Sequence, residues 1–125
     1  NIFFSDLPFA KFLNLTKNIF FKKIYILFPD PWPKKRHQKR RLINNKFVKN
    51  LNKITTSKSE IIIATDDTDY SNQISKTFSN IKNFELVSRR NDNLSFQDNN
   101  IYPTKYFTKA RNHNRKINFF IFIKL

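Results

Sequence analysis

Apolar runs at four places along the chain predict β-strands, at residues 23–28, 60–64, 84–87 and 117–123. A shorter fragment of the same kind stands at residues 2–4. The runs at 23–28 and 60–64 are almost continuously apolar. Such a pattern is typical of strands that are buried on both faces, as in parallel sheets covered by helices.

Between these runs the apolar residues recur three or four positions apart, which is the spacing of one helix face. This spacing predicts helices over residues 8–15, 44–54 and 69–78. Asn44 and Asn45 are both candidates to cap the second helix. The residues expected to face the core from these helices are Phe9, Phe12, Leu13, Phe47, Val48, Leu51, Ile54, Ile74 and Phe78.

Strands that alternate with helices of about ten residues indicate an α/β fold built on a doubly wound, mostly parallel sheet. Residues 91–103 are polar and loop-like, and no helical pattern is evident between the last two predicted strands. We therefore expect those two strands to pair antiparallel at one edge of the sheet. A length of 125 residues is that of one domain, so we expect residues 1–125 to form a single domain.

The predicted strands end beside carboxylates, although acidic residues are scarce in this chain. Asp6 follows the first fragment, Asp30 follows the first long strand, and Asp66 and Asp67 follow the second. Open α/β sheets bind ligands at the carboxyl ends of their strands. These acids therefore mark the edge at which we expect a ligand.

The chain is strongly basic, with 24 Lys+Arg against 9 Asp+Glu and a formal net charge of +15. Such an excess points to a polyanionic partner, for which nucleic acid is the first candidate. The alternative is a lysine-rich solvated surface, because Asn, Ile, Lys and Phe are all abundant here and all have AT-rich codons. The position of the charges has to decide between the two.

Missing residue types exclude several kinds of site within this chain. It has no Cys and only two His, which argues against disulfides and against thiolate or histidine-rich metal sites, so we expect no metal. It has no Gly, which excludes a Gly-rich phosphate loop or a Gly-x-Gly cofactor turn in these residues. No apolar run reaches ~20 residues and residues 1–4 do not read as a signal peptide, so we expect a cytoplasmic monomer without a membrane anchor.

Residues 28–41 form the most informative segment of the chain. Asp30 stands between two prolines that restrict the backbone, so we expect its carboxylate to be held in place. Trp32 offers a flat face on which a base can stack. Six Lys or Arg residues and one His follow within residues 34–41. A charge run is usually a solvated face, but its position after a constrained acid and an aromatic ring favours contact with phosphates.

This segment, residues 28–41, resembles the signature of the bacterial tRNA (guanine-N7)-methyltransferases, which is Phe-Pro-Asp-Pro-Trp followed by a run of Lys, Arg and His. Residues 5–6, Ser-Asp, lie where the family has an acid after its third strand. Residues 64–70 are similar to the family's Ala-Thr-Asp-x-x-x-Tyr. Residues 104–107 are similar to its Thr-Lys-Phe-Glu, with Phe107 in place of the Glu.

The resemblance covers essentially the whole chain and implies a partial Rossmann-like sheet, the later strands of a class I S-adenosylmethionine-dependent methyltransferase. The family's first half, with its Gly-rich turn and the acid that holds the ribose of the cofactor, has no counterpart here. Ala110 replaces a glycine of the family, and residues 67–68 replace an aromatic–acid pair. An alternative to an active enzyme is therefore a non-catalytic basic RNA-binding fragment of a decayed methyltransferase. A basic structural protein, such as a ribosomal one, is a further alternative, but it has no use for a constrained Asp30 among cations.

The resemblance implies transfer of a methyl group from S-adenosylmethionine to N7 of a guanine in tRNA. N7 already carries a lone pair, so placement and stabilisation of the developing cation matter more than a strong base. Asp30 is the implied catalytic residue, and Asp6 and Asp30 are the implied cofactor contacts. Asp66 is an implied contact to the nucleotide, although helix capping is the alternative for Asp6 and Asp66. The implied tRNA-binding residues are Lys34, Arg36, His37, Lys39, Arg40, Arg41, Asp66, Thr104, Lys105, Tyr106 and Phe107.

Overall fold

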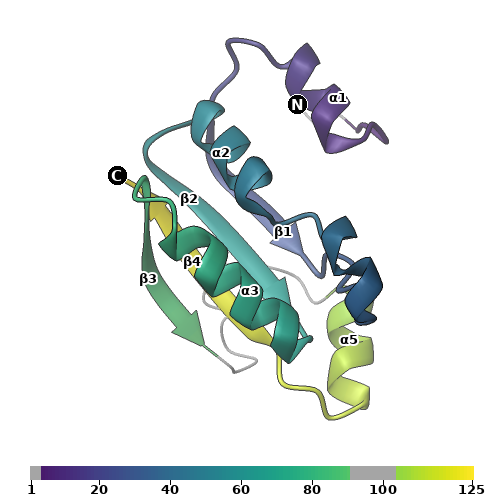
Figure 1. The fold of residues 1–125 in the computed structure, drawn as a ribbon. Helices are drawn as coiled ribbons and strands as arrows, with labels where there is room; N and C mark the ends of the chain where they lie inside the picture. The colour runs from purple at the N-terminus through teal and green to yellow at the C-terminus, as the bar shows by residue number, and fades with distance from the viewer. Residues whose placement is uncertain (1–3, 91–103) are drawn as a thin grey trace.

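The computed structural model describes residues 4–90 and 104–125, which form a four-stranded sheet with helices on both faces (Figure 1). In chain order the elements are α1 (Phe9–Leu15), β1 (Phe21–Leu27), the 3-10 helix η1 (Lys35–Arg40), α2 (Asn45–Lys53), β2 (Thr55–Thr65), α3 (Thr68–Ser79), β3 (Phe84–Arg90), α5 (Lys105–Asn112) and β4 (Asn118–Lys124). The α/β class, the four long strands and the three predicted helices are confirmed. The expected loop at 91–103 and residues 2–3 of the expected first strand lie outside the described residues.

The strand order in the sheet is β1-β2-β4-β3. β1 and β2 are parallel, and β4 runs antiparallel to both of its neighbours, β2 and β3. The expected antiparallel pair at one edge is therefore confirmed, with β3 outermost.

The expectation that no helix separates the last two strands is wrong, because α5 precedes β4. α5 turns only Phe107 and Ala110 toward the core, and its other residues are Lys, Arg, Asn, Thr and Tyr. Two apolar positions in eight residues give too weak a period to predict a helix. The available signal was Thr104, whose side chain accepts a hydrogen bond from the Phe107 amide and caps the helix.

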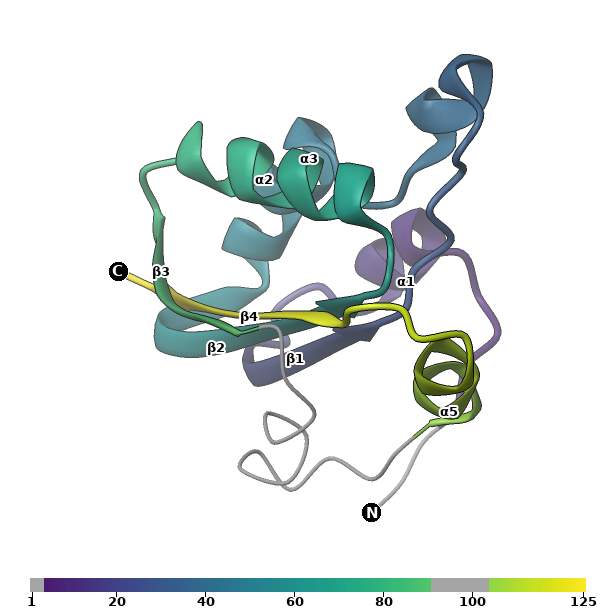
Figure 2. The same cartoon turned by 90° about the horizontal axis from the view of Figure 1, so that it is seen from below.

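The helices form two layers. α2 and α3 lie on one face of the sheet and α5 lies on the other, as the view in Figure 2 shows. The larger core fills the space between the sheet and helices α2 and α3, and all six inward residues expected from those helices are in it. The smaller core lies under α5 and consists of Ile62, Ala64, Phe107, Ala110, Ile117 and Phe119.

β2 is the strand at which the two cores meet. Ile61 and Ile63 belong to the core under α2 and α3, and the alternate residues Ile62 and Ala64 belong to the core under α5. All four side chains are fully excluded from solvent. Burial on both faces explains the continuous apolar run from which this strand was predicted.

β1 departs from the same expectation. Only Ile26 is buried in this strand, and Tyr25 is 45% exposed. β1 is the outer strand of the described sheet, and the core under α5 extends to Leu27 at its end but not to Tyr25. The apolar run of β1 is therefore covered along one face, and on the other face only at its end.

Side-chain caps start the three helices that surround the ligand edge. Asn44 accepts a hydrogen bond from the Phe47 amide at 3.0 Å, which settles the choice between Asn44 and Asn45 for α2. Asp67 accepts from the Tyr70 amide at 2.7 Å and caps α3. Helix capping is thus the role of Asp67 and not of Asp66.

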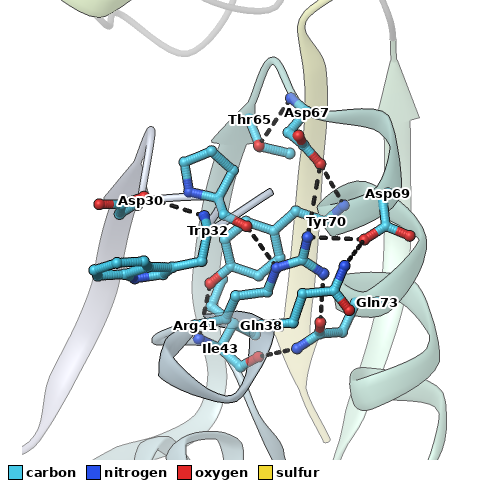
Figure 3. Close-up of polar contacts among 11 residues, drawn as sticks. Asp30, Trp32, Gln38, Arg41, Ile43, Thr65, Asp67, Asp69, Tyr70 and Gln73 are labelled. Atoms are coloured by element: carbon cyan, nitrogen blue, oxygen red, sulfur yellow. Dashed lines mark hydrogen bonds and ion pairs between the residues drawn. The ribbon is translucent and has the colours of Figure 1, made fainter. Parts of the chain in front are cut away.

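A buried arginine fastens the segment after β1 to α3 (Figure 3). Arg41 is 2% exposed. Its Nε donates to the carbonyl of Pro31 at 2.6 Å, and Nη1 donates to Oε1 of Gln73 at 2.7 Å. Nη2 donates to Oδ2 of Asp69 at 2.8 Å, and this carboxylate also accepts from Gln38. The backbone between β1 and η1 is therefore held by a residue that follows η1.

Tyr70 forms the floor below this arginine. The guanidinium of Arg41 lies over the Tyr70 ring, 4.8 Å from its centroid. The phenol oxygen accepts a hydrogen bond from the Ile43 amide at 2.9 Å, and Nε2 of Gln73 donates to the Ile43 carbonyl at 3.1 Å. Burial raises the pKa of the Tyr70 phenol, which the Ile43 amide only partly offsets.

Arg41→Met removes the three donors and keeps a long apolar side chain. We expect the free energy of unfolding to fall by about 2–4 kcal/mol, because partly buried acceptors on Pro31 and Gln73 lose their donor. Urea unfolding followed by circular dichroism measures this loss. Arg36→Met is the matched control, since Arg36 is exposed, and it should change stability by less than ~0.5 kcal/mol. Equal losses in the two variants would contradict the structural role of Arg41.

Tyr70 predicts a pH dependence of stability. Because its pKa is raised in the folded chain, the folded state keeps the phenol proton at a pH where the unfolded chain has lost it. The free energy of unfolding must therefore fall as pH rises above about 10, the ordinary pKa of tyrosine. Tyr70→Phe lacks this ionisation but leaves the Ile43 amide unpaired, at a cost of about 1–2 kcal/mol below pH 9.

The advantage of the wild-type chain over Tyr70→Phe should shrink steadily as the pH is raised through and beyond about 10. Urea unfolding at each pH gives the difference directly. The pKa of Lys23 is also raised, by its hydrogen bond to Glu60, but this residue is common to both proteins and cancels in the difference. An advantage that stays constant at alkaline pH would rule out the raised pKa.

Candidate active site

The chain leaves β1 through a backbone that is unusual at two aromatic residues. Phe28 has φ 52° and Trp32 has φ 42°, both in the left-handed region that bulky residues avoid. The Phe28 amide donates to the Ala64 carbonyl at 2.8 Å, which ties the end of β1 to the end of β2. Strained backbone of this kind persists only where its surroundings fix it, and it concentrates at functional sites.

Asp30 lies at the centre of this exit and is exposed. Its Oδ1 accepts a hydrogen bond from the Trp32 amide at 3.1 Å (Figure 3). The expectation of a held carboxylate therefore has a structural counterpart, a turn closed by the Asp30 side chain itself. Within the described residues Oδ2 of Asp30 has no hydrogen bond, so it is available to a ligand.

A pocket of about 350 Å³ opens beside Asp30, at the carboxyl ends of β1 and β2. It is formed by the strand exit, by the residue after β2, and by α5 with the turn that follows it. Its lining residues are Phe28, Pro29, Asp30, Pro31, Asp66, Tyr106, Lys109 and Arg115. Three of the residues predicted from the sequence, Asp30, Asp66 and Tyr106, are thus brought together in one pocket.

Asp66 is oriented by an ion pair. Its Oδ2 accepts from Nη1 of Arg115 at 2.8 Å, and the two side chains are 19% and 49% exposed. Within the described part of the chain this is the one hydrogen bond of the Asp66 carboxylate, so Oδ1 is left for a ligand. Asp30 and Asp66 therefore each have one oxygen fixed and one available.

Two aromatic rings add flat surfaces to the pocket. Phe28 and Tyr106 are close to parallel, at 24°, with ring centroids 6.4 Å apart. This separation is wider than the 3.9 Å of the stacked pair Phe78 and Phe122 in the core. Tyr106 is 61% exposed, which leaves its ring accessible to a planar ligand.

Trp32, predicted to offer a flat face to a base, does not line this pocket. The guanidinium of Arg40 lies over its ring, 5.1 Å from the centroid, and His37 meets it edge-on at 5.8 Å. Through these contacts Trp32 packs against η1, and it is not one of the residues that line the pocket. Phe28, which the sequence analysis did not select, is the aromatic residue of this segment that faces the pocket.

η1 presents most of the basic run to solvent. The exposed residues of the run are Lys34, Lys35, Arg36, Lys39 and Arg40, and His37 is half-buried. Arg41 departs from its expected contact with phosphate, because its guanidinium is buried and donates to Pro31, Gln73 and Asp69. The run thus supplies five exposed cations and one structural arginine.

Residues 104–107, the segment similar to the family's Thr-Lys-Phe-Glu, also combine structural and accessible side chains. Thr104 caps α5 through its hydroxyl, Lys105 is exposed, and Tyr106 lines the pocket. Phe107 was expected to contact the substrate, but it is 5% exposed and packs in the core under α5. An apolar residue on the inner face of a short helix is used for packing.

Asp6 is exposed on the segment before α1 and does not line the pocket. The helix-capping alternative for Asp6 does not apply either, since the N-cap of α1 is Pro8. The structure therefore does not bring Asp6 together with Asp30.

Lys109 and Arg115 are lining residues that the sequence analysis missed. Lys109 lies three residues after Tyr106 and so on the same side of α5, a spacing from which it could have been predicted. Arg115 comes after the helix, where no periodic pattern points to it.

Residues 4–90 and 104–125 contain neither a cluster of metal ligands nor a membrane-spanning helix. No three His, Asp or Glu side chains in these ranges lie together as a metal site would require. No helix there has the length and apolar character needed to cross a membrane.

Comparison with known proteins identifies relatives along nearly all of the chain. The profile of a family described as "Putative methyltransferase" matches residues 1–120. The tRNA (guanine-N(7)-)-methyltransferase of Wolbachia pipientis wMel is 43% identical over 100 residues, which are 79% of this chain and 42% of the relative. The protein of the same name from Neorickettsia sennetsu is 40% identical over 89 residues, 68% of this chain and 41% of the relative. The Bifunctional methyltransferase of Rickettsia prowazekii is 36% identical over 109 residues, 87% of this chain and 21% of the relative.

The chain spans less than half the length of these curated relatives. The resemblance carried by residues 28–41 and the other motifs agrees with the names of the first two. Because the family profile covers almost the whole sequence, the chain belongs to this family of methyltransferases.

Proposed function

We propose that this chain takes part in the transfer of a methyl group from S-adenosylmethionine to N7 of a guanine in tRNA. The observation that carries the proposal is the pocket at the ends of β1 and β2, which combines two carboxylates with two aromatic rings. The names of the relatives support the same reaction and substrate. A cytoplasmic location follows from this substrate, since bacterial tRNA is modified in the cytoplasm.

The pocket suits a guanine in particular. A guanine is planar and presents N–H donors at N1 and N2 on its Watson–Crick edge, both of which a carboxylate accepts. The available oxygens of Asp30 and Asp66 are acceptors of this kind. Tyr106, which is 61% exposed, offers a face on which the base can stack, a contact worth ~1–3 kcal/mol in single-stranded nucleic acid complexes.

Asp30 is the proposed catalytic residue. Attack by N7 makes the guanine ring cationic, and a carboxylate fixed next to the ring stabilises that charge without having to reorganise. The hydrogen bond from the Trp32 amide and the neighbouring prolines provide that fixation. No proton has to leave N7, so the chain needs no strong base at this position.

The proposed reaction needs a sulfonium cofactor as methyl donor, which when bound would supply an electrophilic methyl carbon. The exposed carboxylate of Asp30 at the end of β1 fits a cationic group and its hydroxyl and amine donors, and it would provide this contact. The chain has no Gly, so a Gly-rich turn for the nucleotide part is not available in these residues. We therefore expect residues 1–125 to contribute one wall of the cofactor site and to bind the cofactor weakly on their own.

The tRNA backbone is the proposed ligand of the exposed cations of η1. Lys35, Arg36, Lys39 and Arg40 of η1, and Lys34 directly before it, are exposed and follow the strand exit in the chain. Lys105, which is exposed at the start of α5, is a further proposed contact to the tRNA. Contacts of this kind position an RNA without reading its sequence.

Asp30→Asn tests the catalytic role. Asparagine keeps an oxygen that can accept from the Trp32 amide, so the turn is preserved while the charge is lost. We expect the methylation rate to fall by about 10²–10³, because one preorganised electrostatic partner is removed. Affinity for tRNA should barely change, since phosphate contacts dominate it.

The measurement is single-turnover methylation of a tRNA transcript beside a filter-binding titration. The chain is assayed in place of the matched segment of the Wolbachia pipientis relative. Glu85→Gln is the matched control and should leave the rate unchanged. It removes one exposed charge near the start of β3, and Glu85 does not line the pocket. A near-normal rate for Asp30→Asn would make Asp30 a turn residue only. A chimera that binds tRNA but never methylates it would favour the non-catalytic RNA-binding alternative.

The exposed cations of η1 predict a steep dependence of RNA affinity on salt. Changing Lys35, Arg36 and Lys39 together to Gln should reduce the slope of log affinity against log salt by about 2–3, at roughly 0.7–0.9 for each lost phosphate contact. The triple change of Lys46, Lys49 and Lys53 on α2 removes the same charge elsewhere and is the control. Equal slopes for the two triple variants would return η1 to the role of a solvated face.

A further inference from the structure

Two cations line the pocket on the side opposite the basic run. Lys109 comes from α5 and Arg115 from the turn after it, whereas none of the residues of η1 is part of the lining. α5 covers the opposite face of the sheet from α2 and α3 (Figure 2). These two cations therefore belong to a surface distinct from that of η1.

Arg115 has donors to spare. A guanidinium carries five N–H groups, and within the described residues Arg115 uses only Nη1, toward Asp66 at 2.8 Å. Its side chain is 49% exposed, so the rest of the guanidinium is open at the pocket. It can hold the carboxylate of Asp66 and a second anionic group at the same time.

Lys109 completes the pair. It lies on the same side of α5 as Tyr106, its side chain is exposed, and no ion pair to it occurs within the described part of the chain. An unpaired ammonium and an open guanidinium on one pocket wall are the groups that bind a phosphate.

We propose that Lys109 and Arg115 bind the phosphate of the target nucleotide itself, as a second phosphate site separate from η1. The proposal rests on the proposed function, because the base of that nucleotide is the guanine held by Asp30 and Asp66. The phosphate of a nucleotide whose base lies in the pocket would be close to the pocket lining, and Lys109 and Arg115 are the cations of that lining. Arg115 then takes part in binding both the base and the phosphate. It orients the Asp66 carboxylate that accepts from the base, and its remaining N–H groups donate to the phosphate.

Small nucleotides isolate this contact from the rest of an RNA. The probes are guanosine, guanosine 5′-monophosphate and adenosine 5′-monophosphate, titrated into the chain and followed by ligand-observed NMR. We expect the monophosphate of guanosine to bind about tenfold more tightly than guanosine, a difference of about 1.4 kcal/mol from charge-assisted hydrogen bonds. The double variant Lys109→Gln and Arg115→Gln should reduce that ratio to about one.

The control is the double variant Arg111→Gln and Lys116→Gln, which removes the same charge from the same segment outside the pocket lining. It should keep the tenfold ratio. Lys109→Gln alone, which breaks no ion pair among the described residues, should lose about half of the free-energy advantage, a ratio of roughly threefold. This single variant keeps the test valid if loss of the Arg115–Asp66 pair disturbs the turn.

The outcomes separate this inference from the proposed function. The second phosphate site is overturned if the pocket variant still binds guanosine 5′-monophosphate about tenfold more tightly than guanosine. It is also overturned if the control variant loses this tenfold ratio to the same extent as the pocket variant. A wild-type chain that binds the guanosine monophosphate no more tightly than guanosine overturns it as well. Equal binding of the guanine and adenine monophosphates, lost together in the pocket variant, would instead leave the phosphate contact standing and contradict the guanine pocket.

Discussion

The ligand edge of this protein depends on one buried charge. A guanidinium inside a protein costs several kcal/mol unless its donors are paired, so Arg41 is stable in its place only while Pro31, Gln73 and Asp69 all stand around it. The segment that carries Asp30 is therefore locked to α3 by the requirement that the charge stay paired. The pocket owes its shape to a residue that does not line it.

A structural feature could be predicted from the sequence when the residues that form it lie close together along the chain. The apolar faces of α2 and α3 and the Asn44 cap of α2 involve residues three or four positions apart, and they were predicted from the sequence. The cap of α3 was predicted one residue too early, at Asp66 in place of Asp67. The burial of Arg41 depends on Gln73 and Asp69, 32 and 28 residues away. A run of six similar cations contains no local sign that one of them turns inward, so that role could not be predicted.

The candidate site shows the same division. Asp30 and Asp66 were found because the ends of parallel strands meet at one edge, which is a rule of topology and needs no side-chain geometry. Their partners were not found, since Arg115 reaches Asp66 across 49 residues of sequence. The resulting pocket holds two carboxylates and two cations inside a chain of net charge +15. Its carboxylates offset the surrounding positive potential at the place where a methylated guanine would become cationic.

The absence of glycine has a consequence for how this chain can change. Five described residues hold a left-handed backbone, at Asn18, Phe28, Trp32, Lys58 and Asn114, a conformation that costs most side chains roughly 1–2 kcal/mol. Asparagine tolerates it better than lysine or an aromatic residue does. A glycine at position 58 would release strain far from the pocket, and stability there can be gained without loss. The same replacement at position 28 would release strain and remove a pocket wall, so at the strand exit thermal robustness and function cannot be improved together.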